Sequence, residues 1–362
     1  MQNLPQVIIK KTERNNIFSM KNKVLIMCDG LFMGCVAMEQ EVHFSTHKIC
    51  DNVTYSSFTS LLKYQGRYYC TFREGESHIF DKDGNAEGRI RVIVSQDGVT
   101  WESALLVGEK GVDLRDPKLS VTPDGRLMLS IGGSIYRERK LMGHVPYVCF
   151  RKDGRKFGRL HRVKVEGEEQ HKMDWIWRTT WHDGVGYTVN YFSSKEAGKG
   201  GGLSLMSTTD GLKYKLLTEF SIPDFPNEST IRFLPDGRML VMVRRDKGDA
   251  MGYWGVSRPP YQDWEWKKME MRLGGPDFVV QDEQNILMGS RTYYIPSRHK
   301  MALYKGRLDG RFEEMCILPS GGDCSYPGLL VEGNELWVSY YSSHEDGRAR
   351  IYLSRIPLDM LK

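Results

Sequence analysis

A strand-turn-strand hairpin recurs along this chain with a spacing near 50 residues. Each copy has a short apolar strand, a polar turn that usually contains glycine, and a second apolar strand, and the clearest copy is "ESTIRFLPDGRMLVMVRR". Strand hairpins repeated at this period are typical of propeller blades. We therefore predict an all-β, six-bladed β-propeller, with hairpins at residues 57–74, 116–133, 178–192, 228–245, 276–291 and 326–343.

Asp-Gly turns lie between these hairpins. The clearest is "SQDGVTW" at residues 95–101, and weaker copies are "RKDGRKF" (151–157), "TTDGLKY" (208–214) and "RLDGRF" (307–312). The aspartate can hydrogen-bond the backbone of its own turn, the glycine tolerates a positive φ, and the aromatic residue packs between sheets. We predict that these residues are structural. No stretch keeps a helical hydrophobic period for more than two turns, which excludes an α/β fold.

Composition limits the possible partners. The chain has 362 residues, 40% of them hydrophobic, and its 51 Lys and Arg against 46 Asp and Glu are spread without a basic run. This pattern predicts a globular protein with one propeller domain over residues 46–362 and no nucleic-acid partner. The seven cysteines form no CxxC pair and no zinc-type spacing, so we predict neither a metal site nor a complete disulfide framework.

Residues 1–45 form a separate N-terminal segment. Read from Met20, "MKNKVLIMCDGLFMGCVA" resembles a secretory signal, and "LFMGC" resembles a lipoprotein box that would place a lipid anchor on Cys35. This reading predicts export to the periplasm or the cell surface. The alternative is a start at Met1, an ordinary N-terminal strand and a cytoplasmic protein. No later stretch approaches the length of a membrane span.

Equivalent ends of successive hairpins should meet on one face of a propeller. Glu228 begins one strand and Arg244 ends its partner, so both should lie at the same rim. Arginines, acids and aromatic rings on one rim suit an anionic sugar, because guanidinium groups bind carboxylates and aromatic faces pack on sugar rings. The equivalent positions are Ser57, Arg73, Asp116, Gly132, Trp177, Arg178, Gly275, Arg291 and Tyr326.

From about residue 50 onward the chain resembles the sialidases, six-bladed propellers with Asp-box (BNR) turns that remove terminal sialic acid with retention. "NEST" and "DGRMLVMVR" match the family's strand-initial glutamate and active-site arginine, which implies these roles for Glu228 and Arg244. "CSYPGLL" resembles the segment with the tyrosine nucleophile, which implies Tyr326. "PSRHKMALYKGRLDG" points to Arg298 as a further substrate-binding arginine, and Arg291 is the competing choice.

The resemblance also implies a catalytic acid and a mechanism. The loop "SHIFDKDGNAEG" lies where the family holds its acid, and Asp81 is better placed than Asp83. Glu228 would act as the general base for Tyr326, and Asp81 would protonate the leaving oxygen and then activate water. This glycosidase needs no metal or organic cofactor, and its partner is a glycan that ends in an acidic sugar.

One position departs from the family pattern. The family begins its first blade with an Arg-Ile-Pro motif, and in "YSSFTSLL" the arginine position is occupied by Ser57. A hydroxyl group does not replace a bidentate guanidinium. We expect Arg73 and Arg115 to supply a substitute charge.

Two further segments keep other functions open. "FREGESH" and "DLRDPKLS" place His78, Arg115 and Asp116 in the first two blades. With Arg178, His78 and Arg115 could serve a polysaccharide lyase or an altered glycosidase, because histidine titrates near neutral pH. The third possibility is a noncatalytic sugar-binding propeller. In "DWIWR", Trp175 or Trp177 could stack on a sugar.

Overall fold

The structure is a computed structural model of the chain. It describes residues 17–24, 38–51, 53–152, 154, 156–196, 201–293 and 299–361, with side chains from residue 44 onward in these ranges. The predicted lipid-anchor position, Cys35, lies outside the described residues. Met20 lies in a strand whose side chains are not described.

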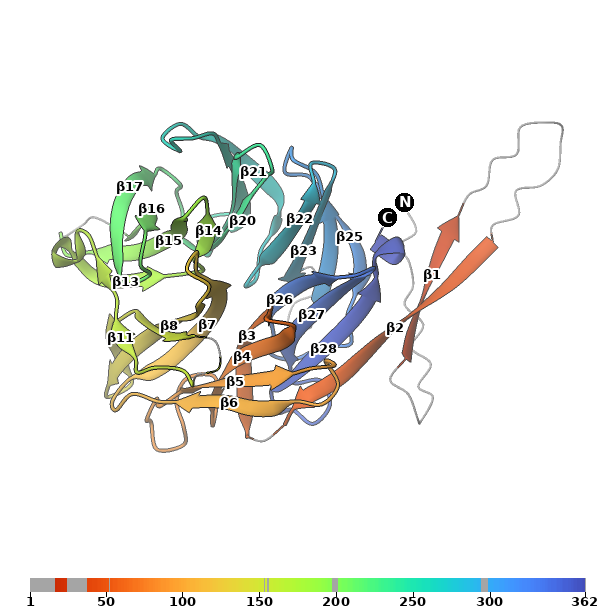
Figure 1. Cartoon of the computed structure of the whole chain (residues 1–362), viewed down its shortest axis with the longest axis horizontal. Coiled ribbons are helices and arrows are strands. Elements are labelled where there is room, and N and C mark those ends of the chain that lie inside the picture. The colour runs from red at the N-terminus through yellow and green to blue at the C-terminus, as the bar shows by residue number, and fades with distance from the viewer. Residues whose placement is uncertain are drawn as a thin grey trace.

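Six antiparallel sheets stand around a common centre and form a six-bladed β-propeller (Figure 1). This confirms the all-β, six-bladed fold expected from the hairpin repeat. The described part of the chain contains only two short 3-10 helices, η1 (Glu168–Gln170) and η2 (Leu358–Leu361).

The first three blades follow one another along the chain. Their strands are, in the first blade, β3 (Tyr55–Tyr64), β4 (Arg67–Gly75), β5 (Arg89–Ser95) and β6 (Glu102–Val107); in the second, β7 (Asp113–Val121), β8 (Leu127–Arg137), β9 (Lys140–His144), β10 (Tyr147–Arg151) and β11 (His161–Arg162); and in the third, β12 (Lys164–Val165), β13 (His171–Ile176), β14 (Thr180–His182), β15 (Val185–Ser194), β16 (Gly201–Thr208) and β17 (Lys213–Phe220).

The last three blades complete the ring. Their strands are, in the fourth blade, β18 (Pro226–Phe233), β19 (Met239–Arg245), β20 (Met251–Ser257) and β21 (Glu265–Arg272); in the fifth, β22 (Asp277–Asp282), β23 (Asn285–Arg291), β24 (Met301–Gly306) and β25 (Phe312–Ile317); and in the sixth, β26 (Cys324–Glu332), β27 (Glu335–Ser342), β28 (Arg350–Pro357), β2 (Met38–Cys50) and β1 (Ile17–Val24).

The sixth blade joins the two ends of the chain. Residues 45–50 of β2 pair with β28, so an N-terminal strand completes a sheet that is otherwise built from the last 40 residues. The Oγ1 atom of Thr46 and the Oγ atom of Ser354 lie 2.7 Å apart in a buried hydrogen bond across this pairing. The other part of β2 pairs with β1, and this hairpin extends away from the ring (Figure 1).

The core lies between neighbouring blades. Residues 239–243, "MLVMV", are fully buried, because both faces of this strand pack against other sheets. Trp254 of the fourth blade packs against Phe278 of the fifth, and its indole N–H donates to the carbonyl oxygen of Leu308 at 2.8 Å. Burial of these apolar surfaces is the main stabilising force of the ring.

Two of the predicted Asp-Gly turns have the structural role expected of them, and Asp153 of the turn at 151–157 lies outside the described residues. In the turn at residues 95–101, the Oδ1 atom of Asp97 accepts hydrogen bonds from the backbone N–H groups of Val99 and Thr100, both at 2.8 Å. Gly98 has a φ of 69°, and Trp101 packs on a buried apolar cluster. Asp210 makes the same pair of backbone bonds in its own turn.

One boundary differs from the prediction. The inner strand of the third blade begins at His171 and has two parts, β13 and β14, which pair with the two halves of β15. The hairpin predicted from residue 178 corresponds only to the second part, β14. The segment between the two parts contains Trp177 and Arg178, so the break in the strand lies at two of the predicted site residues.

Candidate active site

The innermost strands of the six blades form a closed ring. Along this ring β3 contacts β7, β7 contacts β14, β14 contacts β18, β18 contacts β22, β22 contacts β26, and β26 contacts β3. Residues that leave these strands at equivalent points therefore meet at the centre of one face. The structure confirms the geometric basis of the predicted convergence.

Bulges in the inner strands direct side chains to this centre. The innermost strands contain several register shifts, and four of them lie between Ser57 and Ser60, Arg115 and Lys118, Pro226 and Ser229, and Ser325 and Gly328. Three residues inside these bulges have a positive φ: Phe58 at 64°, Asp116 at 46° and Tyr326 at 52°. A bulge changes the direction of a side chain, and strained backbone is concentrated at functional sites. A bulge containing a residue with positive φ thus recurs in the inner strands of three blades.

Tyr326 and Glu228 form the central pair. The Tyr326 hydroxyl donates a hydrogen bond of 2.5 Å to Oε1 of Glu228, which is 7% exposed. Burial, together with the negative charge of Glu228, raises the pKa of Tyr326 well above its usual value. The phenol is therefore neutral and points its proton at a carboxylate. Oε2 of Glu228 is buried and makes no hydrogen bond to any described residue.

Arg244 contacts the same oxygen of Glu228 as Tyr326 does. Its Nη1 atom is 2.8 Å from Oε1 of Glu228, and its Nη2 atom is 2.8 Å from Oδ1 of Asp246. Although burial opposes its charge, Glu228 and the nearby Tyr326 raise the pKa of Arg244. The structure thus brings Glu228, Tyr326 and Arg244 together, three residues that the sequence placed on one rim.

Asp116 and Lys118 add a second charged pair. Burial raises the pKa of Asp116, and its Oδ1 atom has no hydrogen-bond partner among the described residues. Lys118 is 3% exposed, and its Nζ atom lies 4.7 Å from the Trp177 ring centre and 5.7 Å from the Tyr326 ring centre. Burial and the Arg178 cation lower the pKa of Lys118 to about 8.

Arg178 belongs to a buried ion-pair group and makes no direct contact with the Tyr326–Glu228 pair. Its Nη2 atom lies 2.9 Å from Oδ2 of Asp277, whose Oδ1 atom accepts a hydrogen bond of 2.6 Å from Arg232. Burial lowers the pKa of Arg178 to about 10. Trp177 lies beside this group, 2% exposed, with its ring centre 6.2 Å from that of Tyr326.

Arg73 and Arg115 both interact with Asp113. The Nη2 atom of Arg73 lies 2.7 Å from Oδ1 of Asp113, and its Nη1 atom donates to the carbonyl oxygen of Ser77. Arg115 contacts Oδ2 of Asp113 at 3.3 Å and lies 4.9 Å from the ring centre of Phe58. Arg73 is thus committed to a buried ion pair, whereas Arg115 lies closer to the centre.

Phe58 lies at the centre where the resemblance predicts a cation. Ser57 pairs with Arg73 in the sheet and is fully buried, so its side chain does not reach the centre. The next residue, Phe58, sits edge-on to Tyr326 with ring centres 4.9 Å apart. The first blade therefore presents an aromatic ring to the proposed nucleophile.

His78 is held at the rim by a carboxylate that the sequence analysis missed. Its Nδ1 atom lies 2.9 Å from Oδ2 of Asp323 and 2.7 Å from the Tyr55 hydroxyl. Asp323 also accepts hydrogen bonds from Tyr341, at 2.8 Å, and from Tyr55. Although burial opposes ionisation, the bonds from His78, Tyr55 and Tyr341 lower the pKa of Asp323 to about 2.

Arg291 lies near this group. It donates to the Tyr293 hydroxyl at 2.8 Å, and its Nη1 atom is 3.9 Å from Oδ1 of Asp323. Burial opposes its charge, but Tyr293 and Tyr341 raise its pKa. Arg298, the competing arginine, lies outside the described residues.

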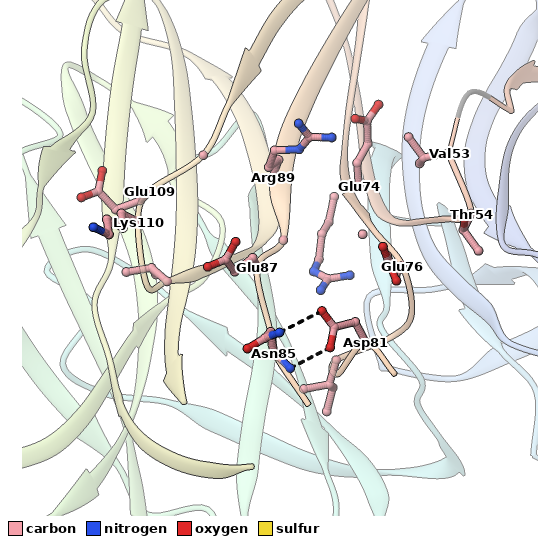
Figure 2. Close-up of a pocket in the computed structure, with 16 residues that line it drawn as sticks. Val53, Thr54, Glu74, Glu76, Asp81, Asn85, Glu87, Arg89, Glu109 and Lys110 are labelled. Atoms are coloured by element: carbon pink, nitrogen blue, oxygen red, sulfur yellow. Dashed lines mark hydrogen bonds between the residues drawn. The ribbon is translucent and has the colours of Figure 1, made fainter. Parts of the chain in front are cut away.

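Asp81 is not brought to the central pair. Its Oδ1 atom accepts a hydrogen bond of 2.9 Å from the backbone N–H group of Asp83. Oδ1 also accepts one of 2.8 Å from the backbone N–H group of Asn85, and Oδ2 lies 3.3 Å from the Asn85 side-chain amide (Figure 2). These bonds, first of all that from the Asn85 backbone, lower its pKa. Asp81 lines a cavity of about 670 Å³ together with Arg73, but neither Tyr326 nor Glu228 lines it. Its predicted role as the acid therefore has no geometric support here.

Three further observations concern possible metal ligands, the place of Trp175 and membrane-spanning helices. Within the described ranges, no group of three or more His, Cys, Asp and Glu side chains is arranged to hold a metal ion. Trp175 packs against His144, with ring centres 4.5 Å apart, and is 4% exposed. No helix in the described part of the chain is long and apolar enough to cross a membrane.

Comparison with solved structures identifies the class of fold. The six-bladed propeller is shared with sialidases and with other proteins of the same architecture. Neither a protein-family model nor a curated protein sequence matches the chain.

Three of the similar structures are informative. A protein of unknown function from Dyadobacter fermentans has a TM-score of 0.70 and 18% identity, over 86% of this chain and 98% of that one. Trypanosoma rangeli sialidase in complex with sialic acid has a TM-score of 0.62 and 11% identity over 95% of this chain, which spans 59% of the sialidase. A mutant α-L-arabinofuranosidase from Fusarium graminearum with an iminosugar inhibitor has a TM-score of 0.59 and 15% identity, over 84% and 94% of the two chains. At these identities the likeness concerns the fold.

Proposed function

We propose that this protein is an exo-acting, retaining glycoside hydrolase with Tyr326 as its nucleophile. The observation that carries the proposal is the hydrogen bond of 2.5 Å from the Tyr326 hydroxyl to Glu228. A nucleophile within hydrogen-bond reach of a base, with the base oriented by a third group, is the usual arrangement for covalent catalysis. Here Arg244 is the third group, 2.8 Å from the same carboxylate oxygen.

In the first step the Tyr326 oxygen attacks the anomeric carbon while its proton passes to Glu228. The bond from that carbon to the leaving oxygen breaks, and its electron pair stays on the leaving oxygen, which takes up a proton. In the second step water attacks the same carbon and gives a proton to the group that protonated the leaving oxygen. The Tyr326 oxygen leaves with its electron pair, and Glu228 returns the proton to it. Two displacements at one carbon give net retention.

The first substrate class is a terminal acidic sugar such as sialic acid. The charges of Arg244 and Arg291 both interact with Tyr326. Lys118 near Tyr326 and Arg115 near Phe58 add positive charge. Guanidinium groups bind carboxylates through paired charge-assisted hydrogen bonds. A tyrosine nucleophile also avoids the repulsion that an anionic nucleophile would meet from an anionic sugar.

A neutral terminal sugar is the second class, and one observation favours it. The ring of Phe58 lies 4.9 Å from that of Tyr326, at the place where the sialidase pattern has a cation. An aromatic ring can pack on the apolar face of a sugar but cannot pair with a carboxylate. The similar arabinofuranosidase acts, by its name, on a sugar without a carboxylate.

The test is turnover of a panel of aryl glycosides that includes an α-sialoside and an α-L-arabinofuranoside. We expect the wild-type protein to release the aryl alcohol from at least one of them and Tyr326→Phe to release none. The matched control is Tyr261→Phe, a buried tyrosine whose hydroxyl bonds to Gly237 far from the centre. A fluorinated form of the accepted sugar should label Tyr326 in peptide mass spectra. Full activity in Tyr326→Phe would overturn the proposal, and binding without turnover would point to a sugar-binding propeller.

A further inference from the structure

His78 has the contacts of an oriented acid or base. Its Nδ1 atom is engaged by Asp323 and Tyr55, at 2.9 Å and 2.7 Å. No hydrogen bond joins its Nε2 atom to any residue that the structure describes, and the side chain is 44% exposed. A carboxylate on one ring nitrogen fixes the orientation of an imidazole and leaves the other nitrogen for the reaction.

The position of His78 relative to Tyr326 is set by Phe58. The ring of Phe58 lies edge-on to both, with centre distances of 5.3 Å to His78 and 4.9 Å to Tyr326. Asp323 lies on the same side, because it also accepts a bond from Tyr341, whose ring is 6.2 Å from that of Tyr326. The nucleophile and the histidine thus flank one aromatic ring at the centre of the propeller face.

The charged groups around His78 come from four elements. Asp323 precedes β26, Tyr55 begins β3, and the charge of Asp116 on β7 interacts with His78 across the centre. Arg73, on β4, donates to the carbonyl oxygen of Ser77, the residue before His78, and so holds the backbone of its loop. Two carboxylates, those of Asp323 and Asp116, therefore interact with the imidazole.

We propose that His78, positioned by Asp323, is the catalytic proton donor and acceptor of the reaction; this inference rests on the proposed glycosidase function. In the first step Nε2 gives its proton to the leaving oxygen as the glycosidic bond breaks, and His78 becomes neutral. In the second step neutral Nε2 takes a proton from the attacking water, and His78 is protonated again. Asp323 is a positioning residue and does not touch the substrate.

Two carboxyl groups are the alternatives. Asp81 uses its carboxylate oxygens to hold its own loop, and these bonds stabilise its charged form. Asp116 lies at the centre, where burial raises its pKa although Lys118 and Arg115 beside it oppose the rise. His78 has one ring nitrogen outside the hydrogen bonds of its own surroundings, whereas the Asp81 oxygens are occupied by its loop, so His78 fits the role better than Asp81. The leaving-group experiment below separates His78 from Asp116.

The experiment compares leaving groups in the full-length protein, with the sugar that the wild-type protein accepts. Removal of a proton donor slows substrates with poor leaving groups and spares those with good ones, because a good leaving group needs no proton. For His78→Gln we expect kcat/KM to fall by roughly 10²- to 10⁴-fold for an alkyl glycoside and by less than about 10-fold for a dinitrophenyl glycoside. Added azide should restore turnover of the dinitrophenyl glycoside by His78→Ala and give a glycosyl azide.

Further variants separate this role from a structural one. Asp323→Asn should also lower kcat/KM more for the alkyl glycoside than for the dinitrophenyl glycoside, but by a smaller factor than His78→Gln does. The matched control is His182→Gln, a histidine of β14 with its own aspartate neighbour at 3.4 Å and away from the centre, which should behave like wild type. Two results would overturn the inference while leaving the glycosidase function intact. One is an equal loss of activity by His78→Gln on both substrates. The other is a selective loss on the alkyl glycoside in Asp81→Asn or Asp116→Asn instead of in His78→Gln. A wild-type protein that cleaves no glycoside would overturn both proposals.

Discussion

The hydroxyl of Tyr326 in the sixth blade donates its proton to Glu228 in the fourth, across 98 residues of sequence. Both residues lie in bulges of inner strands, and Arg244 contacts the same oxygen of Glu228. The two blades are not neighbours in the ring, so this bond spans its centre.

Glu228→Gln tests the base. The amide keeps the shape of the side chain but cannot take a proton from Tyr326, so we expect kcat to fall by roughly 10²- to 10⁴-fold with little change in the melting temperature. Steady-state kinetics on the best aryl glycoside would measure it. The control is Glu283→Gln, a glutamate 48% exposed on the outer turns. Unchanged kcat in Glu228→Gln would exclude a base role.

Lys118 should make the affinity for an acidic sugar fall as the pH rises above about 8. Its pKa is lowered to about 8, so the ammonium is charged below that pH and neutral above it. Because a buried cation attracts an anion, the affinity for sialic acid should fall by roughly 10-fold as the pH rises from 6 to 9.

Calorimetric titrations of Lys118 variants across this pH range would check the assignment. Lys118→Met should bind more weakly at pH 6 and show no such fall in affinity. Lys118→Arg should keep its affinity at pH 9, because a guanidinium stays charged there. If the affinity of Lys118→Met still falls near pH 8, another group causes the pH dependence and the assignment to Lys118 is wrong.

Asp323 should make stability depend on pH. Its folded pKa of about 2 lies below that of an unfolded aspartate, so its contribution is fully present above about pH 4 and is lost as the pH falls toward 2. The contribution is about 2 kcal/mol. Urea unfolding should show Asp323→Asn less stable than wild type at pH 7, and the difference should narrow between pH 4 and pH 2. A constant difference over that range would contradict the prediction.

Trp254 tests the packing between blades. It is 1% exposed, packs against Phe278 of the next blade and bonds to the carbonyl of Leu308. Trp254→Ala should lower the free energy of unfolding by about 3 to 5 kcal/mol. Val99→Ala, at a residue that is 70% exposed, should change it by less than about 0.5 kcal/mol. A loss below about 1 kcal/mol for Trp254→Ala would mean that the blades pack more loosely than described.

The fold was predictable because each blade has a local sequence pattern of its own. A hairpin such as that at residues 228–245 contains its own strands and turn, so six copies predict six blades without knowledge of long-range contacts. The pairing of β2 with β28 was not predictable, because it joins residues about 300 positions apart and no local pattern marks it.

A site residue was predictable only where it occupies an equivalent position in the hairpin repeat. Glu228, Arg244 and Tyr326 lie at equivalent strand ends and were found. Lys118 was missed because the bulge after Arg115 changes which side of the strand faces the centre, and a period-2 pattern does not show a bulge. Asp323 was missed because it precedes its strand, although its place three residues before Tyr326 was a usable signal.

Loop residues were the least predictable. Asp81 follows the resemblance in sequence position, but its carboxylate accepts hydrogen bonds from its own loop, from Asp83 and Asn85. Such bonds depend on the exact spacing of Asp81 and Asn85, which a family pattern does not specify. Its role as the acid stays a prediction, and the leaving-group experiment decides between it and His78.

The pairing of β2 with β28 couples formation of the central Tyr326–Glu228 pair to the completion of synthesis. Residues 45–50 leave the ribosome early and have no sheet partner on that side until residues 351–355 have been made. Tyr326 belongs to the same last blade, so ring closure and the central pair are acquired together. A chain terminated before β28 would carry an open strand edge and no closed site, so a prematurely ended product should aggregate rather than act as a partial enzyme.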